Sequence, residues 1–164
     1  MRIAKLRRSD PVTGLAGPTR FRLVSERALA QGRTAVLLLD LNGIPEPRLL
    51  VELARVLRVT VAKPGVAFRL GGDEFAAVLP KIQFPEQAYE VAGAIASALS
   101  PVIVDGRLTP LSASIGLAVS RPGELSHDEL VHCAELALRR AKRSGPETRW
   151  AVWQDGDATR RGAA

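Results

Sequence analysis

Residues 68–80 read FRLGGDEFAAVLP, two apolar runs that flank a pair of glycines. This pattern is typical of two strands joined by a tight turn. Because glycine has no Cβ, Gly71 and Gly72 also allow a ligand to approach the backbone closely. Asp73 and Glu74 follow at the tip of the turn, where carboxylates suit a metal ion bound to phosphate better than a core. Taken alone, the same residues also fit an exposed turn that carries polar side chains for solubility.

The composition indicates one folded domain. The chain has 164 residues, enough to bury a real core, and 46% of them are hydrophobic, as in ordinary globular proteins. We expect a cytoplasmic protein without membrane attachment, because no apolar run could span a membrane and residues 1–10 lack the apolar block of a signal peptide. The single cysteine, Cys133, excludes an internal disulfide framework. It shares an apolar helical face with Leu130 and Ala134, which predicts a core thiol.

The charge balance favours an anionic ligand. The formal net charge is +6, which suits polyanions such as nucleotides and nucleic acid. Much of the excess lies near the chain ends, where basic residues are usually only solvated. An RNA-binding α+β domain is a remote alternative, since such sheets stack bases on exposed aromatic side chains. Aromatic residues make up only 4% of this chain, so we expect no nucleic acid partner.

Apolar periodicity and turn residues predict an α+β fold. Helical spacing marks four helices, over residues 19–31, 48–59, 84–99 and 126–143. Extended patterns mark strands over residues 35–41, 66–70, 74–79, 102–104, 111–119 and 148–153, with another extended run from residue 108. Thr19 is predicted to cap the first helix, and Ser126 with Glu129 to form a capping box on the last. This order predicts a central, mostly antiparallel sheet of about five strands flanked by helices, with the Gly71-Gly72 turn on a β-hairpin.

We expect the chain to divide into three parts. Residues 1–18 form a basic lead-in with a turn-rich end, residues 19–154 form a single domain, and residues 155–164 form a frayed tail. The sequence contains no evident internal repeat and no glycine-rich strand-to-helix phosphate loop.

Five separated segments, taken in order, resemble the motifs of one family. They are residues 10–15 (DPVTGL), 37–41 (LLLDL), 69–75 (RLGGDEF), 114–116 (SIG) and 134–145 (AELALRRAKRSG). They are similar to the opening motif, first strand, eponymous turn, S-x-G motif and closing helix of the GGDEF domains, bacterial cyclases that condense two GTP into cyclic di-GMP. The resemblance covers nearly the whole chain and implies the nucleotidyl-cyclase-like fold of that family.

The resemblance implies a metal site at the turn. Asp40, the carbonyl of Leu41 and Asp73 would hold Mg²⁺, or Mn²⁺, on the triphosphate of GTP. Hard oxygen ligands from neighbouring strands suit these ions. A plain alternative stays open, in which Asp40 only caps the turn that follows its strand.

The resemblance also implies how the nucleotide would bind and react. Gly71 and Gly72 would let it lie against the turn, and Lys142 would neutralise phosphate charge, although a lysine at a helix end also interacts favourably with the helix dipole. Asp73 and Glu74 would serve the attacking ribose 3′-hydroxyl, as metal ligands or as general base. Because each domain holds one GTP, the reaction would need a homodimer with its two sites face to face.

Several positions depart from the family pattern. After Asp40 the chain reads LNGIPEPRLL, which lacks the asparagine and aspartate with which the family reads guanine, and Glu46 is a candidate substitute. Gly17-Pro18 stands where the family has N-R, and Pro146 stands where it has an arginine. Residues 62–65 (AKPG) stand where the family has the product-inhibition motif R-x-x-D. We therefore expect no inhibitory cyclic di-GMP site.

Two functions follow from these agreements and departures. One is an active diguanylate cyclase with a trimmed base pocket, which rests on Asp40, the GGDEF turn and Lys142. The other is a catalytically degenerate GGDEF domain that acts as a nucleotide sensor or protein-interaction module, which rests on the missing guanine contacts and the missing arginine. A site that binds a base by hydrogen bonds discriminates strongly between bases, and a site without such bonds does not.

Overall fold

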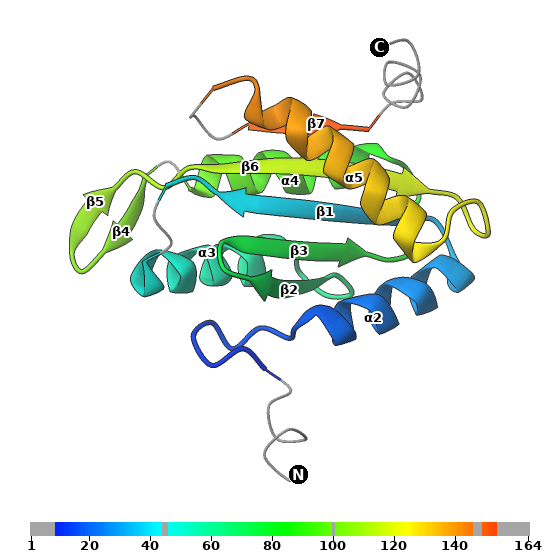
Figure 1. The fold of residues 1–164 in the computed structure, drawn as a ribbon, viewed down its shortest axis with the longest axis horizontal. Coiled ribbons are helices and arrows are strands. Elements are labelled where there is room, and N and C mark those ends of the chain that lie inside the picture. Colours follow the sequence, from blue (N-terminus) through cyan, green and yellow to red (C-terminus); the bar gives the residue numbers. More distant parts are fainter. Residues whose placement is uncertain (1–8, 44–45, 100, 146–148, 154–164) are drawn as a thin grey trace, which may run out of the picture.

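The computed structural model describes residues 9–43, 46–99, 101–145 and 149–153. Its centre is a five-stranded sheet in the order β2-β3-β1-β6-β7 (Figure 1). The strands are β1 (Thr34–Leu41), β2 (Val66–Gly71), β3 (Glu74–Leu79), β6 (Ala113–Ser120) and β7 (Arg149–Val152). Only the β6–β7 pair is parallel, so the predicted α+β fold with a mostly antiparallel sheet is confirmed.

Four helices cover the two faces of this sheet. They are α2 (Pro18–Gln31), α3 (Pro47–Thr60), α4 (Glu86–Ala98) and α5 (His127–Lys142). Helices α2 and α5 pack on one face, and α3 and α4 pack on the other (Figure 1). Alternate residues of β1 supply the two cores, because successive side chains of a strand point to opposite faces. All eight residues of β1 are buried, which explains its almost unbroken apolar sequence.

A small hairpin stands apart from the main sheet. Strands β4 (Val102–Val104) and β5 (Arg107–Thr109) pair only with each other and extend from one end of the molecule (Figure 1). The predicted turn at Asp105 and Gly106 joins them, and both residues have positive φ.

Of the two predicted helix caps, one is confirmed and one is wrong. Ser126 and Glu129 form the predicted capping box on α5. Thr19 does not cap α2, because that helix already begins at Pro18, with Gly17 as a cap that makes no side-chain hydrogen bond. Proline suits the first position of a helix, where its missing N–H costs nothing. Cys133 is buried on the apolar face of α5, as predicted.

The GGDEF turn closes the β2–β3 hairpin, as predicted. Gly71 pairs with Glu74, so that Gly72 and Asp73 form the tip. A register irregularity lies between Arg69 and Gly71, and the φ angles of Gly71 and Gly72 are 143° and 51°. These values explain why glycine is needed at both positions.

The outer parts of the chain are described only in part. Residues 9–18 contact the sheet, since Ala16 forms a bridge with Phe68 and Leu15 is buried in the core. The predicted tail, residues 155–164, lies outside the described residues, and the division of the chain into three parts stays a prediction. Within the described ranges, no helix is long and apolar enough to cross a membrane.

Candidate functional site

The end of β1 brings Asp40 next to the GGDEF turn. In the sheet, Asp40 lies opposite Glu74 of β3 on one side and opposite Ser114 of β6 on the other. The N–H of Leu41 donates a hydrogen bond to the carbonyl of Asp73, at 3.0 Å. The predicted metal residues and the predicted catalytic carboxylates therefore meet at one end of the sheet. We call Asp40, Asp73 and Glu74 the carboxylate cluster.

Lys142 reaches this cluster from the other end of the chain. It is the last residue of α5, and its Nζ donates to Oδ2 of Asp40 in an ion pair. The side chain of Asp40 is 12% exposed, whereas that of Lys142 is 46% exposed. The predicted nucleotide-binding lysine thus lies at the predicted metal aspartate, although 102 residues separate them.

The packing of α5 against β6 explains why Lys142 arrives there. Gly116 lies directly against the backbone of α5. A Cβ at this position would lie 2.2 Å from the nitrogen of Leu138 and 2.3 Å from the carbonyl oxygen of Ala134. Lys142 lies one helical turn beyond Leu138, which is about 6 Å along α5. Ser114 lies two residues before Gly116, which is about the same distance along β6. Lys142 therefore comes level with Ser114 and with Asp40, which pairs with Ser114 in the sheet. A glycine inside a strand often marks such a close approach, and this signal was available in the sequence.

Two members of the carboxylate cluster, Asp73 and Glu74, have raised pKa values. Burial raises the pKa of Asp73, the charge of Asp40 raises it further, and the charge of Lys142 partly opposes them. Partial burial of the carboxyl likewise raises the pKa of Glu74, with further contributions from Asp40 and Asp73, although much of this residue is exposed. Like charges crowded together disfavour ionisation, which is the condition that a bound cation relieves.

The donor chemistry of the cluster fits a magnesium or manganese ion. Oδ1 of Asp40 is buried and has no hydrogen-bond donor among the residues that the structure describes. Carboxylate and carbonyl oxygens are the ligands that these ions prefer. The described residues contain no group of three or more His, Cys, Asp and Glu side chains that could hold a metal ion. The predicted donor set has only two such side chains, Asp40 and Asp73, together with the backbone carbonyl of Leu41.

The two glycines of the turn leave space beside the backbone. Gly71 and Gly72 are exposed, and an added Cβ at either position would have no heavy atom within 4 Å, its chain neighbours aside. This open space is consistent with a ligand that lies against the turn.

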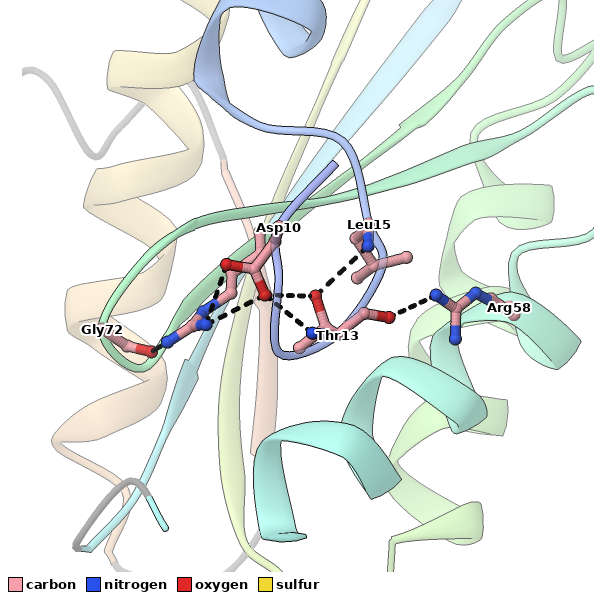
Figure 2. Close-up of polar contacts among 6 residues, drawn as sticks. Asp10, Thr13, Leu15, Arg58 and Gly72 are labelled. Carbon is pink, nitrogen blue, oxygen red and sulfur yellow. Dashed lines mark hydrogen bonds and ion pairs between the residues drawn. The ribbon is translucent and has the colours of Figure 1, made fainter. Parts of the chain in front are cut away.

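A network of hydrogen bonds holds the GGDEF turn against the opening motif (Figure 2). Nη1 of Arg69 donates to both carboxylate oxygens of Asp10, at 3.0 Å each, and Nη2 donates to the carbonyl of Gly72 at 2.9 Å. Asp10 also accepts from the N–H and the hydroxyl of Thr13, at 2.8 Å each. Arg58 of α3 donates to the carbonyl of Thr13. The sequence pattern identified residues 10–15 and Arg69 as motifs but assigned them no role.

The first residue after β1, Asn42, is held to the residue that precedes β6. Asn42 donates to Ser112 twice, backbone to carbonyl and side chain to hydroxyl, at 2.8 Å each. Glu46, the candidate substitute for the guanine contacts, lines a cavity of about 620 Å³ with Arg48, Asp105 and Arg107. This volume lies in the range of small-molecule pockets.

Comparison with known proteins assigns the family. The family model described as "Diguanylate cyclase, GGDEF domain" matches residues 47–148. This chain belongs to the GGDEF domain family. Among solved structures, the GGDEF domain of TpbB (YfiN) from Pseudomonas aeruginosa aligns with a TM-score of 0.83 and 25% identity, over 94% of this chain and 99% of that one. A sensory box/GGDEF family protein from Caulobacter crescentus aligns with a TM-score of 0.73 and 32% identity, over 84% of this chain and 99% of that one.

Two curated relatives are longer than the given chain. An uncharacterized signaling protein from Caulobacter vibrioides is 34% identical over 88% of this chain, and the diguanylate cyclase DgcM from Escherichia coli is 32% identical over 83% of it. The aligned region spans 20% of the first protein and 36% of the second. The given chain therefore spans between a fifth and just over a third of the length of these relatives.

Proposed function

We propose that this GGDEF domain acts in cyclic di-GMP signalling as a diguanylate cyclase that condenses two GTP with Mg²⁺ or Mn²⁺. The observation that carries the proposal is the meeting of Asp40, Asp73, Glu74 and Lys142 at one end of the sheet. The similarity to DgcM, a diguanylate cyclase, supports it.

The chain's own groups have distinct tasks in this reaction. The ribose 3′-oxygen of one GTP attacks the α-phosphorus of the other, and the bond to pyrophosphate breaks as the new P–O bond forms. The hydroxyl proton passes to a carboxylate of Asp73 or Glu74. A raised pKa makes either group a better proton acceptor near neutral pH than an ordinary carboxylate.

The remaining residues would bind and orient the triphosphate. Asp40, the Leu41 carbonyl and Asp73 would hold the metal ion, which when bound stabilises the charge that develops on the phosphates. Lys142 would contact phosphate as a compact cation, and the open space at Gly71 and Gly72 would accept the nucleotide.

The reaction requires two copies of the domain. Each domain would hold one GTP, so that the 3′-hydroxyl and the α-phosphate of each nucleotide meet across a homodimer. The specific activity should therefore rise with protein concentration until the dimer predominates.

Purified protein incubated with GTP and Mg²⁺ or Mn²⁺, followed by chromatography for cyclic di-GMP and pyrophosphate, tests the proposal. The wild type should form both products and Asp73→Ala neither. Glu90→Gln, a charge removed from the exposed side of α4, is the matched control and should retain activity. If dimer-forming concentrations of the wild type yield no product, the cyclase proposal is refuted.

The short loop after β1 favours a second candidate, a sensor that binds nucleotide without converting it to product. Residues 42–47 lack the family's guanine-reading pair. In the absence of product, metal-dependent binding of GTP and ATP with similar affinity would support this candidate. Strong preference for GTP without turnover would show instead that other residues, such as Glu46, read the base.

A further inference from the structure

The ion pair between Lys142 and Asp40 joins a flexible, half-exposed lysine to a largely buried aspartate. Asp40 lies at the end of the central strand with only 12% of its side chain exposed. A carboxylate removed from water in this way needs a compensating charge or hydrogen bonds. Lys142 supplies that charge to Oδ2, while Oδ1 has no donor among the described residues. The negative charge of Asp40 is thus compensated at Oδ2, by Lys142.

The charge of the carboxylate cluster is only partly balanced by this lysine. Three carboxylates face one ammonium group, and the charges of Asp40, Asp73 and Lys142 all act on the ionisation of Glu74. The cluster therefore attracts a divalent cation even with Lys142 in place. A cation that binds Asp40 must nevertheless compete with the ammonium group that is already there.

The backbone of Lys142 is held in place, but its ammonium group can change partner. Gly116 holds the backbone of α5 against β6 one turn before Lys142, so the Cα of this residue has little freedom to move. Its side chain is a flexible four-carbon stem and is nearly half exposed. Nζ can therefore leave Asp40 for another anion without any movement of the helix.

We propose that Lys142 competes with the divalent cation for Asp40 until the triphosphate offers its ammonium group a second anion. The inference rests on the metal site of the proposed function. It adds that Lys142 leaves Asp40 for the triphosphate when the metal ion binds. Metal alone binds weakly, because it must displace Lys142 from a buried carboxylate. Metal and triphosphate bind with positive coupling, because the phosphates accept the charge that Asp40 releases.

Binding of Mn²⁺ in the absence of nucleotide tests this competition directly. The signal of free Mn²⁺ in electron paramagnetic resonance gives the affinity for the full chain, for Lys142→Met and for Arg143→Met. Both variants remove one positive charge from the same end of α5, but Arg143 lies one residue beyond the helix, and the ion pair with Asp40 is made by Lys142. We expect Lys142→Met to bind Mn²⁺ about tenfold more tightly than the wild type, and Arg143→Met to differ by less than about threefold.

A second pair of variants shows whether Lys142 acts through Asp40. In the Asp40→Asn background, adding Lys142→Met should give no further gain in Mn²⁺ affinity, because the contested carboxylate is gone. Circular dichroism checks that every variant is folded.

The inference is overturned by equal or weaker Mn²⁺ binding in Lys142→Met, by an equal gain in Arg143→Met, or by no Mn²⁺ binding in any variant. None of these readouts requires turnover. A protein that forms no cyclic di-GMP but shows the expected affinities would refute the proposed activity and leave the competition at Asp40 supported.

Discussion

Arg69 donates two hydrogen bonds from Nη1 to the carboxylate of Asp10, at 3.0 Å each, across 59 residues of sequence. The same guanidinium group donates to the carbonyl of Gly72, at the tip of the GGDEF turn. The opening motif and the turn are therefore one structural unit, held by a single well-buried cation.

The first prediction concerns Asp10. Replacing it with Asn should lower the free energy of unfolding at pH 7 by about 1–3 kcal/mol, since hydrogen bonds to charged groups are lost. Burial alone would raise the pKa of Asp10, but hydrogen bonds from Thr13 and Arg69 outweigh it, so the pKa lies below its ordinary value of 3.8. The lower folded-state pKa means that this stabilisation is present above pH 3.8 and is lost as the pH falls through the folded-state value.

Urea unfolding of the wild type and Asp10→Asn between pH 3 and pH 7 measures this effect. The difference in unfolding free energy should be largest near neutral pH and should shrink below about pH 4. Glu90→Gln is the control and should change stability by less than about 0.5 kcal/mol at any pH. A difference between wild type and Asp10→Asn that stays constant over this range would contradict the assignment.

The second prediction concerns the contact between Gly116 and α5. Gly116→Ala places a methyl group against backbone atoms of Ala134 and Leu138, which cannot give way as a flexible side chain would. We expect a loss of stability of about 1–3 kcal/mol and a shift of α5 that weakens the contact between Lys142 and Asp40.

Gly93→Ala is the matched control for this substitution. Gly93 lies inside α4, where an added Cβ would meet nothing within 4 Å. Alanine favours a helix interior over glycine, so Gly93→Ala should raise stability by about 0.5–1 kcal/mol. Thermal unfolding measures both variants, and a Gly116→Ala protein as stable as the wild type would show that α5 does not lie as close to β6 as described.

The third prediction separates the two capping residues. Ser126→Ala removes the side-chain acceptor for the N–H of Glu129 and should cost about 1 kcal/mol. Thr19→Ala should change stability by less than about 0.5 kcal/mol, because Thr19 lies in the first turn of α2 and does not cap it. Urea unfolding of both variants decides the matter, and a larger loss for Thr19→Ala than for Ser126→Ala would reverse the interpretation.

The fourth prediction concerns product inhibition. Ala62 and Gly65 stand in the places of the arginine and aspartate of the family's inhibitory motif, so cyclic di-GMP should bind there only weakly. An aspartate at position 65 would bring its Cβ to 2.9 Å from Cγ1 of Val61 and 3.1 Å from Cδ2 of Leu79, so the double variant Ala62→Arg, Gly65→Asp should not create a tight site. Calorimetry with cyclic di-GMP measures both proteins, and submicromolar binding by the wild type would contradict the prediction.

Local signals in the sequence were sufficient for most of the fold. The apolar run of residues 35–41, the helical spacing of residues 48–59 and the glycine pair at the turn each appear as the predicted element. These signals are short-range, because strand and helix periodicities and turn chemistry depend on neighbouring residues. The start of α2 was missed because Pro18 and Thr19 are both acceptable helix-start residues, whereas in the structure Gly17 takes the cap position and its carbonyl accepts from the N–H of Phe21.

The sequence by itself determined which residues could form the site, and the tertiary structure decided which of them meet. Asp40 and the GGDEF turn carry recognisable motifs, so their chemistry could be predicted residue by residue. The ion pairs of Lys142 with Asp40 and of Arg69 with Asp10 join residues 102 and 59 positions apart. Such contacts depend on the order of strands in the sheet and on which helix packs against Gly116. The glycine inside the strand is a local sign of a close approach, but the partner helix and the strand order are set by the packing of whole elements against one another.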